Sequence, residues 1–370
     1  SEFSVQDRQF MQRALDLAAK GEYSTAPNPA VGCVLVKDGE IVGEGFHFKA
    51  GQPHAERVAL AEAGERAKGA TAYVTLEPCA HYGRTPPCAS GLIEAGVTKV
   101  LAAVQDPNPQ VAGKGLRMLA EAGIESAVGL LEESAEKLNK GFFKRMHQGV
   151  PFVQLKLAMS LDGRTALANG ESKWLTSTAS RSDVQKMRAK SSALLSTSAT
   201  VLADNPSLNV RWEDFPDDLK SVYAKQAVRQ PVRVLLDSQH RIRPSHKLFK
   251  TTSPVWLVSS VERDISAFPD FCEQIILPKQ NLLSELMFEL GKRQINCLWV
   301  EAGANLAGSL IEQELVDELI VYIAPKLLGE QARGLCRLPH LTRLADASLW
   351  RLDAFQQIGD DIKLIYTPKG

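Results

Sequence analysis

The chain has 370 residues, and its 43 lysines and arginines are balanced by 43 aspartates and glutamates, so no overall charge favours binding to nucleic acid or to a membrane surface. No apolar run approaches the roughly 20 residues of a membrane-spanning helix, the N-terminus lacks a signal-peptide pattern, and six cysteines in so long a chain do not form a disulfide framework. The sequence therefore predicts a cytoplasmic enzyme of two ordinary domains, without nucleic-acid or membrane partners.

The first part of the chain alternates helices and strands. Periodicity predicts a helix, a hairpin that turns at Asp38-Gly39, a helix that begins near Pro53, a strand, a helix that Cys88 opens and Gly96 ends, and a further strand. Apart from the helix near Pro53, the predicted ranges are 8–19, 32–36 with 41–46, 72–76, 88–95 and 99–104. This order is typical of a mixed sheet covered by helices.

A second domain follows a boundary at Gly149-Val150-Pro151, so the predicted domains are residues 1–149 and 150–370. Apolar runs predict strands at residues 152–157, 193–196, 232–236, 255–258, 274–277, 297–300 and 318–323. Helical patterns separate several of them, at residues 181–189, 282–291 and 306–313. Strands that alternate with helices in this way predict a second α/β domain.

The most informative feature is His54-Ala55-Glu56, which Pro78-Cys79 and Cys88 follow. One His and two Cys offer three zinc ligands, whereas a structural zinc site has four. With three, the fourth position is left to water, whose pKa zinc lowers towards about 7, and Glu56 can take and return a proton. Zinc deaminases use this arrangement to replace a ring amino group by oxygen. Because residues two apart on a regular helix do not share a face, the sequence leaves open whether His54 and Glu56 converge on one metal.

Other interpretations of this feature stay open. The two cysteines could be ordinary buried thiols, and a zinc-stabilised binding module would need a closed site with four ligands. Nucleoside and tRNA deaminases carry Cys-x-x-Cys, whereas eight residues separate Cys79 from Cys88 here, so we expect this longer loop to contact the substrate. The four remaining cysteines are interpreted as small buried hydrophobic residues: Cys33, Cys272, Cys297 and Cys336.

Two segments of the second half carry weaker signals. The turn from Glu301 to Ser309 lies between a strand and a helix, and glycines at such a turn let backbone N–H groups approach a phosphate. The Rossmann glycine spacing is absent, so a plain strand-to-helix turn is the alternative. The polar residues 196–206 follow another strand and are interpreted as a loop with an Asx turn, unless they bind a ligand.

Five motifs together resemble the bifunctional deaminase/reductase family of bacterial riboflavin biosynthesis. They are Asn28-Pro29-x-Val31-Gly32, His54-Ala55-Glu56, the segment from Pro78-Cys79 through Gly83-Arg84-Thr85 to Cys88, Asp106-Pro107-Asn108-Pro109, and Ser160-Leu161-Asp162-Gly163-Arg164. The resemblance spans nearly the whole chain. It implies a cytidine-deaminase-like three-layer N-terminal domain fused to a dihydrofolate-reductase-like α/β C-terminal domain.

The resemblance also implies a reaction sequence. Zinc, one ion per chain, supports hydrolytic deamination of 2,5-diamino-6-ribosylamino-4(3H)-pyrimidinone 5′-phosphate, and NADPH then reduces the ribosyl group to ribityl. This pyrimidine ribosyl phosphate is the expected small-molecule partner, and we expect a homo-oligomer. The alternative is a nucleoside or tRNA deaminase domain fused to a reductase with a different substrate.

In the first domain, the resemblance implies zinc ligation by His54, Cys79 and Cys88, with Glu56 as the proton shuttle. It places Asn28, His47, His81, Asp106 and Asn108 around the pyrimidine and ribose, with Arg84 at the phosphate.

In the second domain, the resemblance implies that NADPH contacts Ala158, Trp174, Thr200, Asp204, Ser238, and the turn of Gly303, Ala304, Asn305, Leu306, Ala307, Gly308 and Ser309. It implies that substrate contacts Ser172, Arg188, Leu208, Arg211 and Glu301, with Lys156 near the reacting ribose. The residues alone leave three alternatives open: Trp174 is a core residue, Arg188 lies on a solvated helix face, and Asp204 is a helix cap.

Overall fold

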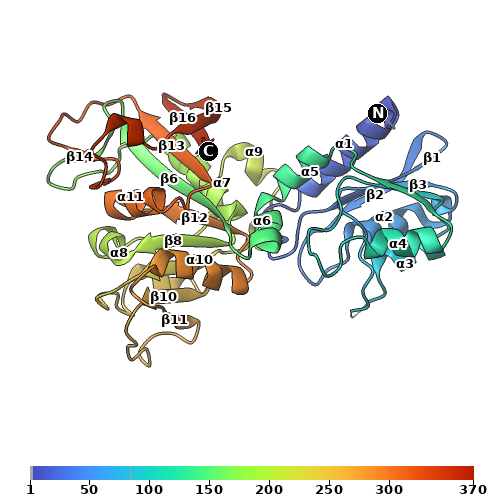
Figure 1. Cartoon of the computed structure of the whole chain (residues 1–370), viewed down its shortest axis with the longest axis horizontal. Coiled ribbons are helices and arrows are strands. Elements are labelled where there is room, and N and C mark those ends of the chain that lie inside the picture. Colours follow the sequence, from blue (N-terminus) through green and yellow to red (C-terminus); the bar gives the residue numbers. More distant parts are fainter. Residues whose placement is uncertain (1–2, 84) are drawn as a thin grey trace. The chain divides into compact units, whose positions relative to one another are not determined.

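The structure is a computed structural model that describes residues 3–83 and 85–370. Its chain divides into two compact units, residues 1–149 and 150–370, and each unit is described by itself (Figure 1). None of the helices in the described residues combines the length and the apolar character that crossing a membrane requires.

The N-terminal unit is built on a five-stranded mixed sheet with the strand order β2-β1-β3-β4-β5. Its strands are β1 (Gly32–Lys37), β2 (Glu40–Phe46), β3 (Thr71–Val74), β4 (Lys99–Ala102) and β5 (Glu125–Val128). Its helices are α1 (Val5–Ala19), α2 (Ala55–Ala63), α3 (Cys88–Glu94), α4 (Lys114–Glu121), α5 (Glu132–Leu138) and α6 (Lys140–Gln148). Strand β1 pairs antiparallel with β2 and β3, whereas β3, β4 and β5 are parallel, which confirms the predicted hairpin and mixed sheet.

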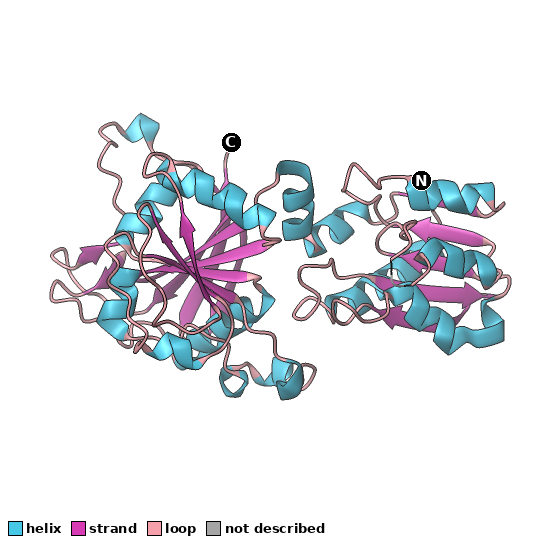
Figure 2. Ribbon diagram, turned by 90° about the horizontal axis from the view of Figure 1, so that it is seen from below, coloured by secondary structure: helices cyan, strands magenta, loops and turns pink. Residues whose placement is uncertain are grey.

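Alternation along β1 divides the core of this unit into two layers. Val34 and Val36 pack with residues of α1, α5 and α6, whereas Cys33 and Leu35 pack with α2, α3 and α4. Successive side chains of a strand point to opposite faces of its sheet, so an apolar run such as residues 33–36 is buried on both sides. The helices on both sides of the strands are visible in Figure 2.

The C-terminal unit is built on a nine-stranded sheet with the order β11-β10-β9-β8-β12-β6-β13-β16-β15. Its strands are β6 (Phe152–Ser160), β8 (Ala193–Thr197), β9 (Val232–Leu236), β10 (Val255–Ser259), β11 (Cys272–Ile276), β12 (Cys297–Glu301), β13 (Glu318–Ala324), β15 (Trp350–Ile358) and β16 (Asp361–Pro368). A separate pair is formed by β7 (Arg164–Ala166) and β14 (Arg333–Gly334). The helices of the C-terminal unit are α7 (Thr178–Lys190), α8 (Ser198–Asp204), α9 (Asp217–Lys220), α10 (Leu282–Lys292) and α11 (Ala304–Glu312).

In the order of the sheet, neighbouring strands from β11 through β10, β9, β8, β12 and β6 to β13 pair in parallel. Strand β16 then pairs antiparallel with β13, and β15 pairs antiparallel with β16 at the edge. Leu195 and Val234 pack towards α10 and α11, whereas their neighbours Leu194 and Leu235 pack towards α7 and α8. A parallel sheet covered on both faces explains why these strands are continuous apolar runs in the sequence.

Several elements differ from the sequence prediction, and α1, α8 and the pair of β15 and β16 show the reasons most clearly. Helix α1 begins at Val5 rather than at residue 8, because Ser4 and Asp7 form a reciprocal capping box. Residues 198–204 are helix α8 rather than a loop with an Asx turn, because the Thr197 hydroxyl caps the N–H of Thr200. No pattern above predicts β15 and β16, whose side chains are largely exposed along β15.

Candidate active sites

His54 stands just before helix α2 rather than inside it. Its backbone is extended (φ −71°, ψ 162°) and it is the N-cap residue, while Glu56 lies in the first helical turn. The rule that residues two apart point to different helix faces therefore does not apply to this pair. Pro53 precedes the cap, and the helix predicted to begin near Pro53 begins at Ala55, which confirms the predicted start within two residues.

His54 meets both cysteines through one ring nitrogen. His54 Nδ1 lies 3.2 Å from Cys88 Sγ and 3.8 Å from Cys79 Sγ, and the ligand atoms of all three residues lie within 4.8 Å of one another. Tetrahedral ligands with zinc bonds of about 2.0–2.3 Å lie roughly 3.5 Å apart. The donor set and its spacing therefore fit a zinc ion with three protein ligands.

A hydrogen bond between the two thiols shifts their pKa values in opposite directions. A hydrogen bond from the Cys88 thiol, helped by His54, lowers the pKa of Cys79 to about 4, and the backbone N–H of Cys88 also donates to Cys79 Sγ at 3.2 Å. The same thiol–thiol hydrogen bond, followed by burial, raises the pKa of Cys88. One thiolate thus forms readily at neutral pH, which is the form that binds a metal.

Glu56 is buried beside these thiols, with 4 % of its surface exposed. Burial, followed by the charge of Cys79, raises its pKa to about 7. A carboxyl group that titrates near neutral pH can both accept and donate a proton during a reaction. The predicted proton shuttle and the predicted ligands are therefore brought together.

His47 and Asn28 form a hydrogen-bonded chain next to His54. His47 Nδ1 lies 3.1 Å from the carbonyl of Pro53, its Nε2 lies 3.1 Å from Asn28 Nδ2, and its ring centre is 5.2 Å from that of His54. Because a carbonyl only accepts, Nδ1 carries the hydrogen and Nε2 accepts from the amide of Asn28. Burial lowers the pKa of His47, which favours this neutral form.

The other predicted contacts of the first domain lie in two loops. Asp106 accepts from the N–H of Asn108, and Asn108 accepts from the N–H of Gln110. Burial, followed by the charges of Glu77 and Cys79, raises the pKa of Asp106, while His81 opposes the rise, so Asp106 lies near Cys79 and the exposed His81. Arg84, the predicted phosphate contact, lies outside the described residues.

Arg57 supports the cysteine loop and was not predicted. Its Nη2 donates to the carbonyls of Pro86 and Pro87 at 3.0 Å each. This contact fixes the residues before Cys88 against helix α2. The signal in the sequence is weak, because a basic residue after Glu56 is also common on a solvated helix face.

The C-terminal unit contains a cavity of about 1400 Å³ at the carboxyl ends of its parallel strands, the usual place for a ligand in such sheets. All the residues predicted to contact NADPH or substrate line it except Ala307 and Gly308: Lys156, Ala158, Ser172, Trp174, Arg188, Thr200, Asp204, Leu208, Arg211, Ser238, Glu301, Gly303, Ala304, Asn305, Leu306 and Ser309.

The two exceptions belong to helix α11, which begins directly after Gly303. Ala307 is buried in the core that α10 and α11 form with the sheet. A Cβ on Gly308 would lie 1.8 Å from the carbonyl oxygen of Arg337, whereas one on Gly303 would meet nothing within 4 Å. Gly308 therefore permits close packing of the helix rather than approach of a ligand, and the predicted glycine turn is instead the first turns of a helix.

Two of the predicted cationic contacts are already engaged by acidic side chains. Arg188, which is 8 % exposed, donates to Glu301 through Nε at 2.6 Å and Nη2 at 2.9 Å, and to the carbonyl of Asn209 at 2.8 Å. Arg211 donates to Asp214 and to the side chain of Asn209. Arg188 therefore does not lie on a solvated helix face, and a substrate contact by either arginine would use the N–H groups that remain.

Lys156 shares this charged cluster. Burial lowers the pKa of Lys156. Burial raises the pKa of Glu301, but the charge of the neighbouring Arg188 outweighs this effect and holds the pKa below its ordinary value. The cluster thus contains two basic groups for one carboxylate.

Trp174 is 62 % exposed and is not a core residue. The Arg181 guanidinium lies 4.2 Å from its ring centre, close enough for a cation–π contact. The pair leaves an aromatic face on the cavity wall. Asp204 is the last residue of α8 and also lines the cavity.

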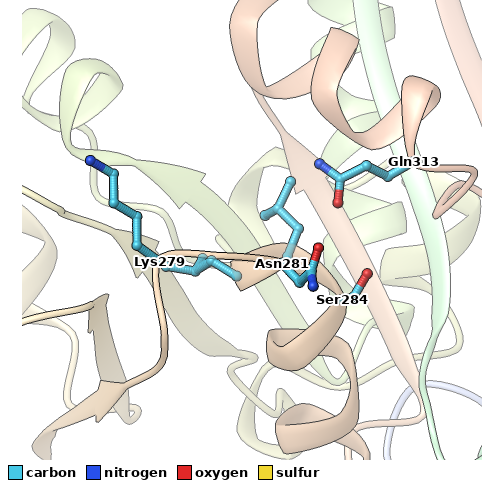
Figure 3. Close-up of a pocket in the computed structure, with 6 residues that line it drawn as sticks. Lys279, Asn281, Ser284 and Gln313 are labelled. Atoms are coloured by element: carbon cyan, nitrogen blue, oxygen red, sulfur yellow. The ribbon is translucent and has the colours of Figure 1, made fainter.

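A smaller depression of about 500 Å³ lies at the start of α10 (Figure 3). Lys279, Asn281, Ser284 and Gln313 line it, and the lysine points away from the other three. None of the predicted cofactor or substrate contacts takes part in it.

Of the remaining cysteines, Cys33 and Cys272 are buried as predicted, whereas Cys297 and Cys336 are only partly buried. Cys336 lines the large cavity. For these last two residues the prediction of a buried hydrophobic residue is wrong.

Comparison with known proteins identifies both domains. Residues 4–104 match the cytidine and deoxycytidylate deaminase zinc-binding region, and residues 151–364 match the RibD C-terminal domain. The chain is 79 % identical over 369 residues to the riboflavin biosynthesis protein RibD of Haemophilus influenzae, covering 100 % of this chain and 99 % of the relative. It is 55 % identical to RibD of Escherichia coli, with 97 % and 99 % covered.

Solved structures give the same relationship. RibD of Acinetobacter baumannii matches with a TM-score of 0.92 and 46 % identity, and 99 % of each chain is covered. The diaminohydroxyphosphoribosylaminopyrimidine deaminase/5-amino-6-(5-phosphoribosylamino)uracil reductase of Thermotoga maritima matches with a TM-score of 0.86 and 33 % identity, with 98 % and 99 % covered.

Proposed function

Because this chain belongs to the RibD family of deaminase/reductases of riboflavin biosynthesis, we propose that residues 1–149 carry out the deamination and residues 150–370 the reduction. The proposed substrate is 2,5-diamino-6-ribosylamino-4(3H)-pyrimidinone 5′-phosphate. Zinc and NADPH are the cofactors, and the final product is 5-amino-6-ribitylamino-uracil 5′-phosphate.

In the deaminase site, His54 Nδ1 and the sulfurs of Cys79 and Cys88 would hold zinc. When bound, zinc makes a water molecule acidic near neutral pH and so supplies the nucleophile. Glu56 accepts a proton on its buried carboxylate and returns it to the departing amine. Asn28, His47, His81, Asp106 and Asn108 would surround the pyrimidine and ribose, and Arg84 would bind the phosphate.

In the reductase site, the cavity must hold the nicotinamide and the ribosyl C1′ face to face. Trp174, Thr200, Asp204, Ser238 and the start of α11 would bind NADPH. The cluster of Lys156, Arg188 and Glu301, with Ser172, Leu208 and Arg211, would bind the substrate. Remote contacts to the phosphate would provide binding energy for this alignment.

The observation that carries the proposal is the convergence of three zinc ligands and one buried carboxyl group that titrates near neutral pH. The test is incubation with the diaminopyrimidine phosphate, with and without NADPH, followed by mass spectrometry. The deaminated ribosyl compound should accumulate without NADPH and should become the ribityl compound with it. Deamination of cytidine or tRNA in place of this substrate would support the alternative.

Fragments can test how the two activities divide between the units. Asn139, at the junction of α5 and α6, donates to and accepts from the backbone of Ala30 at 2.8 Å in both directions. Phe143 and Leu130 complete the same core as Val34. A fragment of residues 1–149 should therefore fold and deaminate without NADPH, whereas one that ends at residue 104 should not fold. A folded, zinc-loaded 1–149 fragment that is inactive would contradict the division.

We also propose a homo-oligomer that forms through β15. This edge strand exposes Phe355 by 72 % and Leu352 by 46 %, and an exposed apolar edge strand is prone to pair with another chain. Light scattering after size exclusion should show Phe355→Glu to be smaller than the wild type, and an unchanged mass would contradict this interface. The cytoplasmic location and the absence of nucleic-acid and membrane partners stay predictions from the sequence.

A further inference from the structure

Glu77 is a buried acid that precedes the zinc-ligand segment Pro78-Cys79, and 5 % of its surface is exposed. Each of its carboxylate oxygens accepts from two backbone N–H groups. Oε1 accepts from Asp106 and Gly113 at 3.0 Å each, and Oε2 accepts from Gly115 at 2.9 Å and Leu116 at 3.3 Å. A buried charge of this kind is stable because oriented N–H donors replace its water.

The donors come from one segment, the loop from Asp106 to Gly113 and the start of α4. The N-cap of α4 is Gly113, which has no side chain to satisfy the first N–H groups of the helix. Glu77 supplies these acceptors from a distant part of the sequence, and its negative charge is favourable at the positive end of the helix dipole. The Glu77 carboxylate therefore determines where this loop and helix dock.

Two glycines allow this docking. Gly113 has φ +82°, a left-handed conformation that side chains rarely adopt, and a Cβ on Gly115 would lie 1.8 Å from the carbonyl oxygen of Pro78. The start of α4 thus rests directly on the backbone that leads into Cys79. The backbone N–H of Glu77 also donates to the carbonyl of Val104, at 2.9 Å. Both the backbone and the side chain of Glu77 therefore hold the segment that contains Val104 and Asp106.

We propose that Glu77 is a positioning residue of the deaminase, which sets the Asp106–Asn108 loop at a fixed place relative to the Cys79 ligand. The proposal rests on the proposed function, in which this loop contacts the pyrimidine and ribose. The Glu77 carboxylate accepts from backbone N–H groups of the loop and of α4, so it acts through the position of the loop. Its loss should misplace the substrate contacts, and therefore weaken substrate binding, while His54, Cys79 and Cys88 still bind zinc.

The test is Glu77→Gln in the full chain. A glutamine has one acceptor oxygen, so its amide NH₂ faces two N–H donors and those hydrogen bonds are lost. We expect the deaminase KM to rise about tenfold or more, the order that loss of one charge-assisted hydrogen bond gives. We expect kcat to fall less than KM rises, and zinc content and reductase turnover of the deaminated intermediate to stay unchanged.

Gly115→Ala places a methyl group against the carbonyl of Pro78 and should displace the start of α4 from Glu77. We expect it to give the same rise in KM. Asp7→Asn is the matched control, because Asp7 also caps a helix of this unit, α1, and hydrogen-bonds to Ser4 and Tyr73; it should lower Tm without raising KM. The proposal is overturned if Glu77→Gln binds zinc with a KM within twofold of wild type. It is also overturned if zinc content and kcat fall together at unchanged KM, or if the variant fails to fold and Gly115→Ala leaves KM unchanged. A wild-type chain that binds zinc without deaminating the substrate would instead contradict the proposed function.

Discussion

Lys156 and Glu301 are register partners on the neighbouring parallel strands β6 and β12, and Arg188 closes the cluster by a bidentate contact to the Glu301 carboxylate. One carboxylate therefore serves two basic groups inside the reductase cavity. An excess positive charge at the end of parallel strands suits an anionic ligand. The same excess of charge means that the partly buried ammonium group of Lys156 destabilises the folded unit.

Lys156→Met should therefore abolish reduction and stabilise the C-terminal unit at neutral pH. Burial lowers the pKa of Lys156, so the unfolded chain binds more protons between the folded pKa and the ordinary value of about 10.4. Wild-type stability rises with pH across that window, and the advantage of methionine shrinks towards about pH 10.4. We expect Tm to rise by about 2–4 °C at pH 7, the shift that ~1 kcal/mol gives in a unit of this size.

Calorimetry at pH 7 and pH 10 checks this prediction. Lys292→Met, on an exposed position of α10, is the control and should show no such pH dependence. An advantage for Lys156→Met that grows with pH would contradict the assigned direction of the pKa shift.

Glu56→Gln should retain zinc and lose deamination. The amide keeps the shape of the buried side chain but cannot shuttle a proton, so we expect deaminase kcat to fall by about 10²–10⁴-fold. Zinc analysis and reductase turnover in the same chain serve as controls. Near-normal deamination by a zinc-loaded variant would remove Glu56 from the mechanism.

The sequence was sufficient to select Glu56 and the three candidate zinc ligands, which the structure brings together, because each belongs to a short local motif. It did not predict Glu77 or Arg57, since their partners, the loop at Asp106 to Leu116 and the carbonyls of Pro86 and Pro87, lie about 30–40 residues away. Strand β15 was missed for a different reason. Most of its residues are exposed, so the burial that produces an apolar or alternating pattern is absent.

Cys88→Ser should lose zinc, because an alcohol is a poor replacement for a thiolate ligand at neutral pH. Cys88 supplies one of three ligand atoms within 4.8 Å of one another, so the remaining pair cannot form the site. Metal analysis of the purified chain measures the loss. Cys272→Ser, a buried cysteine of the other unit, should keep zinc, and zinc retained in both variants would argue against ligation by Cys88.

Gly303 and Gly308, at the start and in the middle of α11, are both predicted to contact NADPH from the sequence but differ in their surroundings. Gly303 has φ −80° and ψ −179°, an extended backbone that any residue adopts, and open space lies where its Cβ would be. Gly303→Val should therefore fold normally. If NADPH lies against this N-cap, the added side chain should raise the apparent KM for NADPH and cause the deaminated ribosyl compound to accumulate.

Gly308→Ala should behave differently, because its Cβ would lie 1.8 Å from the carbonyl of Arg337 and packed backbone does not yield to such a contact without strain. We expect a lower Tm of the C-terminal unit and loss of reduction through misfolding, with deamination unaffected. Thermal unfolding of both variants separates the two causes. A stable Gly303→Val variant with unchanged affinity for NADPH would exclude this helix start from the cofactor site and leave Thr200 and Asp204 on α8 as the stronger candidates.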